Sequence, residues 1–175
     1  MTIRTGSALA IVATCLILSA PVVRAMDEDE NEGDQTAVVK ALSQARVSLN
    51  QGLLASAHEG TPISAKFEME DGKLQLSVYT MKADKFSEVG VDPIGGKVVN
   101  VEVITEGDDL AAAKSQSDAM KKARRSLGAA LQEALKANRD YQAVSVIPSL
   151  KDGHAVAEVV LAKGEELKTV EEKLD

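Results

Sequence analysis

The sequence predicts an α+β fold made of two small units, each a helix packed on an antiparallel hairpin or three-stranded sheet. Two Asp-Gly pairs, Asp71-Gly72 and Asp152-Gly153, lie 81 positions apart between segments in which apolar and polar residues alternate. Such a pair tolerates the positive φ angles of a tight type I′ turn. Before each hairpin, apolar residues recur at steps of three and four, which is typical of an amphipathic helix. The chain is therefore predicted to be a tandem duplication, although few residues are identical between its halves.

Composition agrees with a folded protein that has an aliphatic core. Of 175 residues, 45% are hydrophobic and 27% charged, whereas the aromatic share is 2% and Trp is absent. Packing must then come from Val, Leu, Ile and Ala, which bury less area per residue than aromatic side chains. Small domains also bury a smaller fraction of their surface. We therefore expect the two units to dock on each other or to share a partner.

The N-terminus predicts a secretory signal peptide over residues 1–25. Arg4 precedes an apolar run from Ala8 to Ala20, and Val23-Arg24-Ala25 resembles a small-residue cleavage site. The run is shorter than the roughly 20 residues that a membrane span requires, so cleavage after Ala25 is favoured over a retained anchor. A periplasmic location is expected, with no membrane span in the mature form.

Cys15, the only cysteine, lies inside the apolar run. A lipoprotein is the alternative that it raises, but Leu16-Ile17-Leu18 continues the run beyond it, which argues against lipidation. Cleavage would also remove Arg4 and Arg24, leaving 18 basic against 27 acidic residues and a net charge of −9. Because nucleic-acid binding needs a basic face with aromatic platforms, nucleic acid is not an expected partner.

An acidic leader is predicted over residues 26–36. Asp27–Asp34 contains six carboxylates and no apolar residue, so it is expected to be disordered and solvated. A weak contact with a divalent cation or a basic partner is the alternative. The run lacks the ordered Asp/Asn-Gly-Glu loop of a calcium site.

The first unit is predicted over residues 37–106. A helix starts near Thr36, with Thr36 or Asp34 as its N-cap, and ends at Gly60-Thr61-Pro62. A hairpin turns at Asp71-Gly72, and a third strand is expected around 87–91. Residues 97–105 form a further strand or a bridge to the second unit. The apolar stripe of the helix is Val38, Leu42, Ala45, Leu49 and Leu53.

The two faces of this hairpin are predicted from its alternation. One face meets the helix and the other faces solvent. Its apolar members are Ile63, Ala65, Phe67, Met69, Leu74, Leu76 and Val78, and its polar members are Lys66, Glu68, Glu70, Lys73, Gln75, Ser77 and Tyr79.

The second unit is predicted over residues 110–175. One helix runs from about Leu110 or Ser117 to Ala137, and Gly128 within it indicates close approach by a neighbour. Strands follow on both sides of Asp152-Gly153, and Leu167–Leu174 is the last strand or a fraying end of the chain. Pro148 cannot donate a ladder hydrogen bond, so its strand should be an edge or contain a bulge.

Residues 37–105 resemble the PepSY domain family. The resemblance lies in Ala65–Tyr79, with its Asp-Gly-Lys turn, and in the closing Val91-Asp92-Pro93-Ile94-Gly95-Gly96-Lys97-Val98. Residues 117–175 resemble a second, more divergent copy, in which His154 replaces the lysine. The resemblance implies an exported, non-catalytic module that inhibits, regulates or chaperones an envelope or secreted peptidase, with a metallopeptidase as one candidate.

The residues themselves predict no enzyme, no cofactor and no metal site. His58 and His154 are the only histidines, which excludes a His-Glu-x-x-His zinc helix. No serine lies in a Gly-x-Ser-x-Gly motif, and Gly95-Gly96 lacks the residues of a phosphate-binding loop. Carboxylate pairs such as Glu68 and Glu70 are interpreted as solvated charge.

Two binding routes remain open from the sequence. One is the polar hairpin face, with Lys73, Gln75, Ser77 and Tyr79 as the candidate binding residues and Tyr79 as the aromatic anchor. The other is an uncovered edge strand that pairs with an extended peptide. The first hypothesis is a periplasmic peptidase-binding protein, and the alternative is a structural or assembly partner of a cell-envelope complex.

Overall fold

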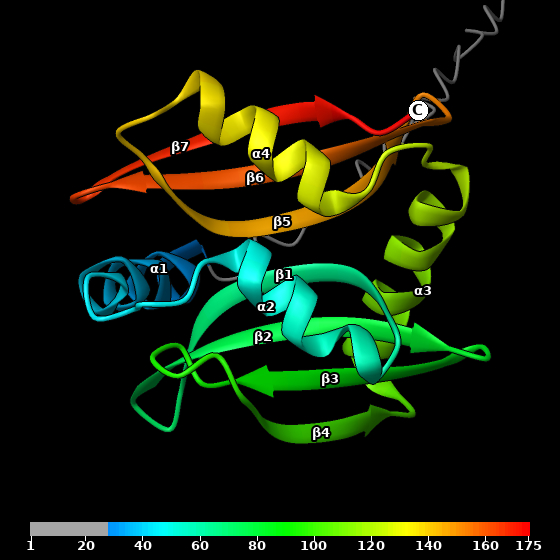
Figure 1. Ribbon diagram of the computed structural model, residues 1–175, viewed down its shortest axis with the longest axis horizontal. Helices are drawn as coiled ribbons and strands as arrows, with labels where there is room; N and C mark the ends of the chain where they lie inside the picture. Colours follow the sequence, from blue (N-terminus) through cyan, green and yellow to red (C-terminus); the bar gives the residue numbers. More distant parts are fainter. Residues whose placement is uncertain (1–27) are drawn as a thin grey trace, which may run out of the picture.

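The computed structural model describes the backbone of residues 28–175 and the side chains from Gln35 onward, and it is an α+β fold (Figure 1). Seven antiparallel strands form one sheet in the order β4-β3-β2-β1-β5-β6-β7. The helices are α1 (Glu28–Leu42), α2 (Leu49–Ala55), α3 (Gly107–Lys122) and α4 (Leu127–Ala137), with a 3-10 turn at Ser56–His58. The strands are β1 (Thr61–Glu70), β2 (Lys73–Lys82), β3 (Lys85–Val91), β4 (Val98–Ile104), β5 (Gln142–Lys151), β6 (His154–Lys163) and β7 (Glu166–Lys173).

The expectation of two small units with separate sheets is wrong, because β1 and β5 join the halves into a single sheet. They pair through Ala65 with Val146 and Lys66 with Ser145. Both halves also contribute to one continuous hydrophobic core. Two small aliphatic units gain more buried area by sharing a sheet and a core than by folding apart.

The duplication is visible in the strand registers. Val146 is the counterpart of Ala65 at the 81-residue offset, so the central pair joins a position to its own equivalent. Each half also has a bulge at the same place, between Pro62 and Ser64 and between Ala143 and Ser145. An internal two-fold relation therefore passes through the middle of the sheet.

Helix α1 overturns two predictions about the first unit. It includes residues 28–36 of the predicted leader, and Asp34 and Thr36 lie within it, so neither is its N-cap. Acidic residues suit a helix N-terminus because they oppose its dipole. The predicted single helix is also wrong, since α1 ends at Leu42 and α2 begins after Ser48. Ser48 and Gln51 form a capping box that starts the new helix.

The predicted single helix of the second unit is likewise two helices. α3 ends at Lys122, and Ser126 caps α4 by accepting a hydrogen bond from the Ala129 amide. Gly128 therefore lies in the first turn of α4, not in mid-helix. The close approach expected there is confirmed, because an added Cβ would lie 2.8 Å from Asn50 Oδ1 of α2.

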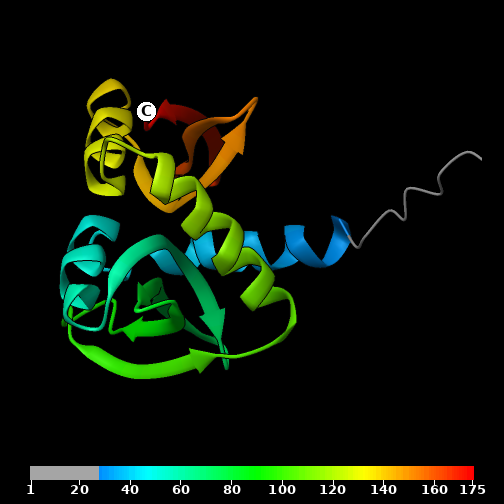
Figure 2. The same ribbon diagram turned by 90° about the vertical axis from the view of Figure 1, so that its right-hand side faces the viewer.

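Helices cover both faces of the sheet. α2 and α4 lie side by side on one face, and α1 and α3 reach them from the other side of the sheet (Figure 2). The main core lies under α2 and α4 and includes Leu49, Leu76, Leu131 and Val159. A second cluster lies on the opposite face, where α3 packs on the first half; its buried members are Ile63, Tyr79, Phe86 and Ala113.

The hairpin predictions are confirmed. Asp71 (φ 49°) and Gly72 (φ 72°) form the first turn, and Asp152 and Gly153 form the second. Residues 97–105 contain a true strand, β4, rather than a bridge. The expectation for Pro148 is met in part: it lies beyond the last pair with β1, although the bulge of β5 lies elsewhere.

The predicted signal peptide, its cleavage after Ala25 and Cys15 lie outside the described residues. Within residues 28–175, no helix is long and apolar enough to cross a membrane.

Candidate functional site: an open edge strand and a buried polar network

β4 is the outermost strand beside β3, and its side chains are exposed on both faces (Figure 1). Val99 and Val103 are each 64% exposed and Val101 is 42% exposed. Val101 lies opposite Val89, which is fully buried in the main core, so this valine stripe extends the core face beyond its helix cover. An exposed apolar edge strand is a template for pairing with another strand.

The turns of the sheet determine which backbone groups of β4 are free. Ala83 and Asp84, both with positive φ, form a two-residue turn, so the flanking pair Lys82 and Lys85 is hydrogen-bonded. Hydrogen-bonded and non-hydrogen-bonded pairs alternate along an antiparallel ladder. Residues 86, 88 and 90 therefore bond to β4 through residues 104, 102 and 100. The N–H and C=O groups of Val101 and Val103 point outward at the open edge.

The opposite edge of the sheet is protected by charge. β7 has the sequence Glu-Leu-Lys-Thr-Val-Glu-Glu-Lys, and five of its eight residues are charged. Residues 98–104 of β4 contain only Glu102 as a charged residue. Charged side chains on an edge strand discourage pairing with other chains. Of the two edges, β4 is therefore the one suited to accept a strand.

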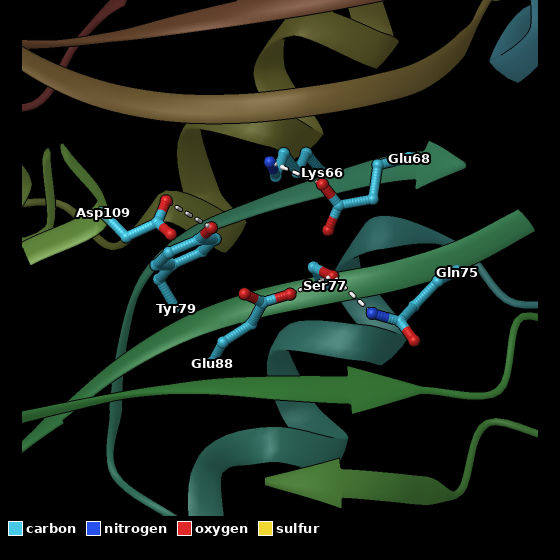
Figure 3. A network of polar contacts seen from close by, with 7 residues as sticks. All are labelled: Lys66, Glu68, Gln75, Ser77, Tyr79, Glu88 and Asp109. Atoms are coloured by element: carbon cyan, nitrogen blue, oxygen red, sulfur yellow. Dashed lines mark hydrogen bonds and ion pairs between the residues drawn. The ribbon is translucent and has the colours of Figure 1, made fainter. Parts of the chain in front are cut away.

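The polar face of the first hairpin forms a network rather than an open surface (Figure 3). Gln75 Nε2 donates to Ser77 Oγ at 3.0 Å, and Ser77 Oγ donates to Glu88 Oε1 at 2.7 Å. Lys66 Nζ lies 2.6 Å from Glu68 Oε2 and 5.7 Å from the centre of the Tyr79 ring.

The electrostatics of this network follow from its partial burial. Burial raises the pKa of Glu88, and the nearby Glu68 carboxylate adds to the shift, while the hydrogen bond from Ser77 opposes it. Burial, followed by the charges of Glu88 and Asp109, raises the pKa of Tyr79, so its hydroxyl stays protonated. It donates to Asp109 Oδ1 at 3.4 Å.

The four predicted binding residues have different surroundings. Lys73 is exposed as expected, and Gln75 is half-buried. The expected exposure is wrong for Ser77 and Tyr79, which are 0% and 6% exposed. Tyr79 lies in the second hydrophobic cluster with Ala113 of α3, so the helix covers the residue predicted as an anchor. Sequence alone does not show that a second helix covers the polar face.

A groove of about 330 Å³ lies beside this network and shares Lys66 and Glu68 with it. Aliphatic residues of α1 and of the second half form much of its wall, including Val39, Ile147 and Val160. Glu158 adds a second carboxylate. An anion would meet two carboxylates and one ammonium group here, so the groove does not suit an anionic ligand.

The histidines occupy structural positions. His154 Nδ1 lies 2.5 Å from Asp175 Oδ2, and this hydrogen bond lowers the pKa of Asp175. His58 lies in the 3-10 turn on the other half of the molecule. In the described part of the chain, no cluster of three or more His, Cys, Asp and Glu side chains is placed to hold a metal ion.

A short sequence repeat also supports the duplication, but its two copies are not 81 residues apart as the Asp-Gly turns are. Ala45-Arg46-Val47-Ser48-Leu49 and Ala123-Arg124-Arg125-Ser126-Leu127 match at an offset of 78. Both segments place a serine N-cap before a helix. In each, two successive amides bond to one carbonyl, that of Pro93 or that of Leu174, at positions 81 apart. The smaller offset reflects three additional residues between helix start and strand in the second half.

Comparison with known proteins identified no relative, because no protein-family model, no curated protein and no solved structure matches the chain.

Proposed function

We propose that the protein is a non-catalytic binding module that takes up an extended segment of a partner protein at the open edge of β4. The observation that supports this most directly is the combination of outward backbone groups at Val101 and Val103 with an exposed valine stripe. In strand addition, backbone hydrogen bonds supply affinity and alternate side chains supply specificity. The preferred segment is therefore extended, with apolar residues at every second position.

The partner class that we propose is an envelope or secreted peptidase, which the protein inhibits, regulates or helps to fold in the periplasm. The resemblance of residues 37–105 to the PepSY family motivates this choice. Strand addition also suits a peptidase partner, because a segment of the peptidase that pairs with β4 is held away from other contacts. Signal cleavage after Ala25 and export are parts of this proposal.

An assembly role in a cell-envelope complex is the second candidate. Its support is Leu54, which is 67% exposed on α2 and faces away from the core. In that role the helix surface, rather than the strand edge, would make the contact. A Leu54→Lys variant separates the two candidates because it leaves β4 unchanged.

The test is a titration of the purified protein against a secreted metallopeptidase of the same cell, following hydrolysis of a labelled protein substrate and the refolding yield of the enzyme. We expect the rate or the yield to change with the wild type. Val101→Pro should weaken the effect about tenfold or more, because it removes an outward N–H without breaking a bond to β3. Thr169→Pro is the matched control, since the turn after Lys163 places the Thr169 N–H at the open edge of β7.

Equal effects of the wild type and Val101→Pro would contradict strand addition. No effect on any secreted peptidase of the cell would contradict the peptidase role. Affinity capture that returns an envelope assembly through wild type but not through Leu54→Lys would support the second candidate instead.

A further inference from the structure

The sequence of β4 is complementary to itself when two copies run antiparallel. Valines occupy positions 99, 101 and 103 on one face, while Asn100 and Glu102 lie on the other. Within one copy, Asn100 Nδ2 already donates to Glu102 Oε1 at 2.9 Å. The strand therefore carries one amide donor and one carboxylate acceptor placed symmetrically about Val101.

We propose that β4 pairs with β4 of a second copy of this chain, in the antiparallel register that places Val101 of both copies opposite each other. This inference rests on the proposed function, because both use the open edge of β4. Self-pairing closes that edge, so the binding site is blocked until a partner strand displaces the second copy.

The direction in which the N–H and C=O groups of β4 point restricts the registers in which two copies can pair. In an antiparallel pair, residues that exchange hydrogen bonds must both direct their N–H and C=O groups toward the neighbour. Val101 and Val103 meet this condition, whereas Asn100 and Glu102 bond to β3. Odd-numbered residues of one copy must then face odd-numbered residues of the other. A slip of one residue would also move the valine stripe to the opposite face.

Charge selects one of the remaining registers. With the Val101 residues opposite each other, Asn100 of each copy faces Glu102 of the other, so both carboxylates have an amide donor. A shift toward the C-terminus places the two Glu102 side chains opposite each other, and like charges in that position are destabilising. A shift toward the N-terminus places the Asn100 side chains together and sets each Glu102 against the irregular end of β4 at Val98, so neither carboxylate meets an amide donor. The proposed register is the only one of the three in which every polar side chain meets a complementary one.

The fold already contains this type of junction. At the centre of the sheet, β1 and β5 run antiparallel and pair Ala65 with its own counterpart Val146. The proposed contact repeats that geometry between molecules and would give a continuous sheet of two chains. Its apolar side joins the valine stripes of both copies, and aliphatic cross-strand pairs of this kind stabilise a sheet.

A charge exchange at the centre of the junction tests the proposal. Sedimentation equilibrium of the purified wild type should show a dimer, and Val101→Lys and Val101→Glu should each dimerise about tenfold or more weakly than the wild type. An equimolar mixture of the two variants should restore the dimer, because lysine then faces glutamate. Both substitutions lie at an exposed position, so circular dichroism should show an unchanged fold. Thr169→Lys on β7 is the matched control and should dimerise as the wild type does.

Cross-linking tests the register independently. Asn100→Cys mixed with Glu102→Cys, in protein that lacks Cys15 after signal cleavage, should form an intermolecular disulfide, whereas Glu102→Cys alone should not. Efficient cross-linking of Glu102→Cys alone would overturn the register. A wild type that is monomeric at all concentrations, or a mixture that fails to recover the dimer, would overturn self-pairing.

These outcomes are distinguishable from those of the proposed function. A dimer that leaves every peptidase unaffected supports self-pairing and contradicts the peptidase role. A monomer whose peptidase effect is lost in Val101→Pro supports strand addition and contradicts self-pairing.

Discussion

Single polar residues in this protein owe their surroundings to helix α3 and to strand neighbours rather than to their sequence neighbours. Ser77 and Tyr79 alternate with apolar residues as solvent-facing residues do, yet both are buried. Each has a specific partner, since Ser77 donates to Glu88 and Tyr79 donates to Asp109. Hydrogen bonds of this kind offset the cost of burying a hydroxyl group. The alternation therefore identifies the two faces of the hairpin, except that the bulge between Pro62 and Ser64 places Ile63 on the face of Tyr79. It does not show that both faces are covered.

Replacing Glu88 with Gln should alter the pH dependence of stability. The pKa of Glu88 is raised above its ordinary value of 4.5, chiefly by burial. The stabilisation that Glu88 contributes is therefore fully present at pH values below its pKa in the unfolded chain. It is lost as the pH rises through its higher pKa in the folded protein. Glu88→Gln avoids this loss and keeps an oxygen acceptor for Ser77. Above the folded pKa we expect the variant to be more stable than the wild type by up to about 1 kcal/mol, because the side chain is only half buried.

Urea unfolding between pH 4 and pH 8 provides the measurement. The stability difference should grow with pH and then become constant. Glu70→Gln, at the exposed end of β1, is the control. A difference that does not change with pH would contradict the proposed origin of the shift.

Among the elements, α2 approaches the sheet closely at Gly52. Gly52 faces Leu76, which is fully buried on β2, and an added Cβ would lie 2.4 Å from Leu76 Cδ2. The corresponding position in the second half, at the 78-residue offset, is Ala130, so α4 has room for a methyl group. The two helices are thus equivalent in topology and differ in their distance of approach.

Gly52→Ala should lower the free energy of unfolding by up to about 2 kcal/mol. The gain in helix propensity is about 1 kcal/mol, but overpacking against a buried Leu76 costs about 1–3 kcal/mol. Gly128→Ala is the matched comparison, because its Cβ would meet only the end of the flexible Asn50 side chain. That variant should be neutral or stabilised by up to about 1 kcal/mol. Denaturant midpoints of both variants against wild type give the answer, and equal destabilisation of the two would refute the explanation.

At the scale of the whole molecule, the two halves are coupled by their core more than by their strands. Only two residue pairs join β1 to β5. The main core, by contrast, contains residues of both halves, from Val38 to Leu174. Leu174 is fully buried near the C-terminus, and its carbonyl accepts bonds from the amides of Arg124 and Arg125. The halves should therefore unfold together as one cooperative unit.

Leu174→Ala should destabilise both halves by the same amount, about 2–5 kcal/mol, through the cavity that it creates. The chain has no Trp and two Tyr residues, so the fluorescence of Tyr79 in a Tyr141→Phe background reports on the first half. Tyr141 in a Tyr79→Phe background reports on the second half. The control for each measurement is the same single-tyrosine protein with Leu174 unchanged. Loss of the Tyr141 signal before that of Tyr79 would show that the halves unfold separately.

The sequence by itself determined the α+β class, both Asp-Gly hairpins and the duplication, because these depend on local turn chemistry and on the alternation of neighbouring residues. It did not determine the helix breaks before Ser48 and Ser126, since the apolar stripe continues through both. Only the tertiary structure decided that the halves share one sheet, that α3 buries Tyr79, and that β4 remains open. Each of these depends on which distant segments pack together, and pairing and burial between distant segments leave no periodic signal in the chain.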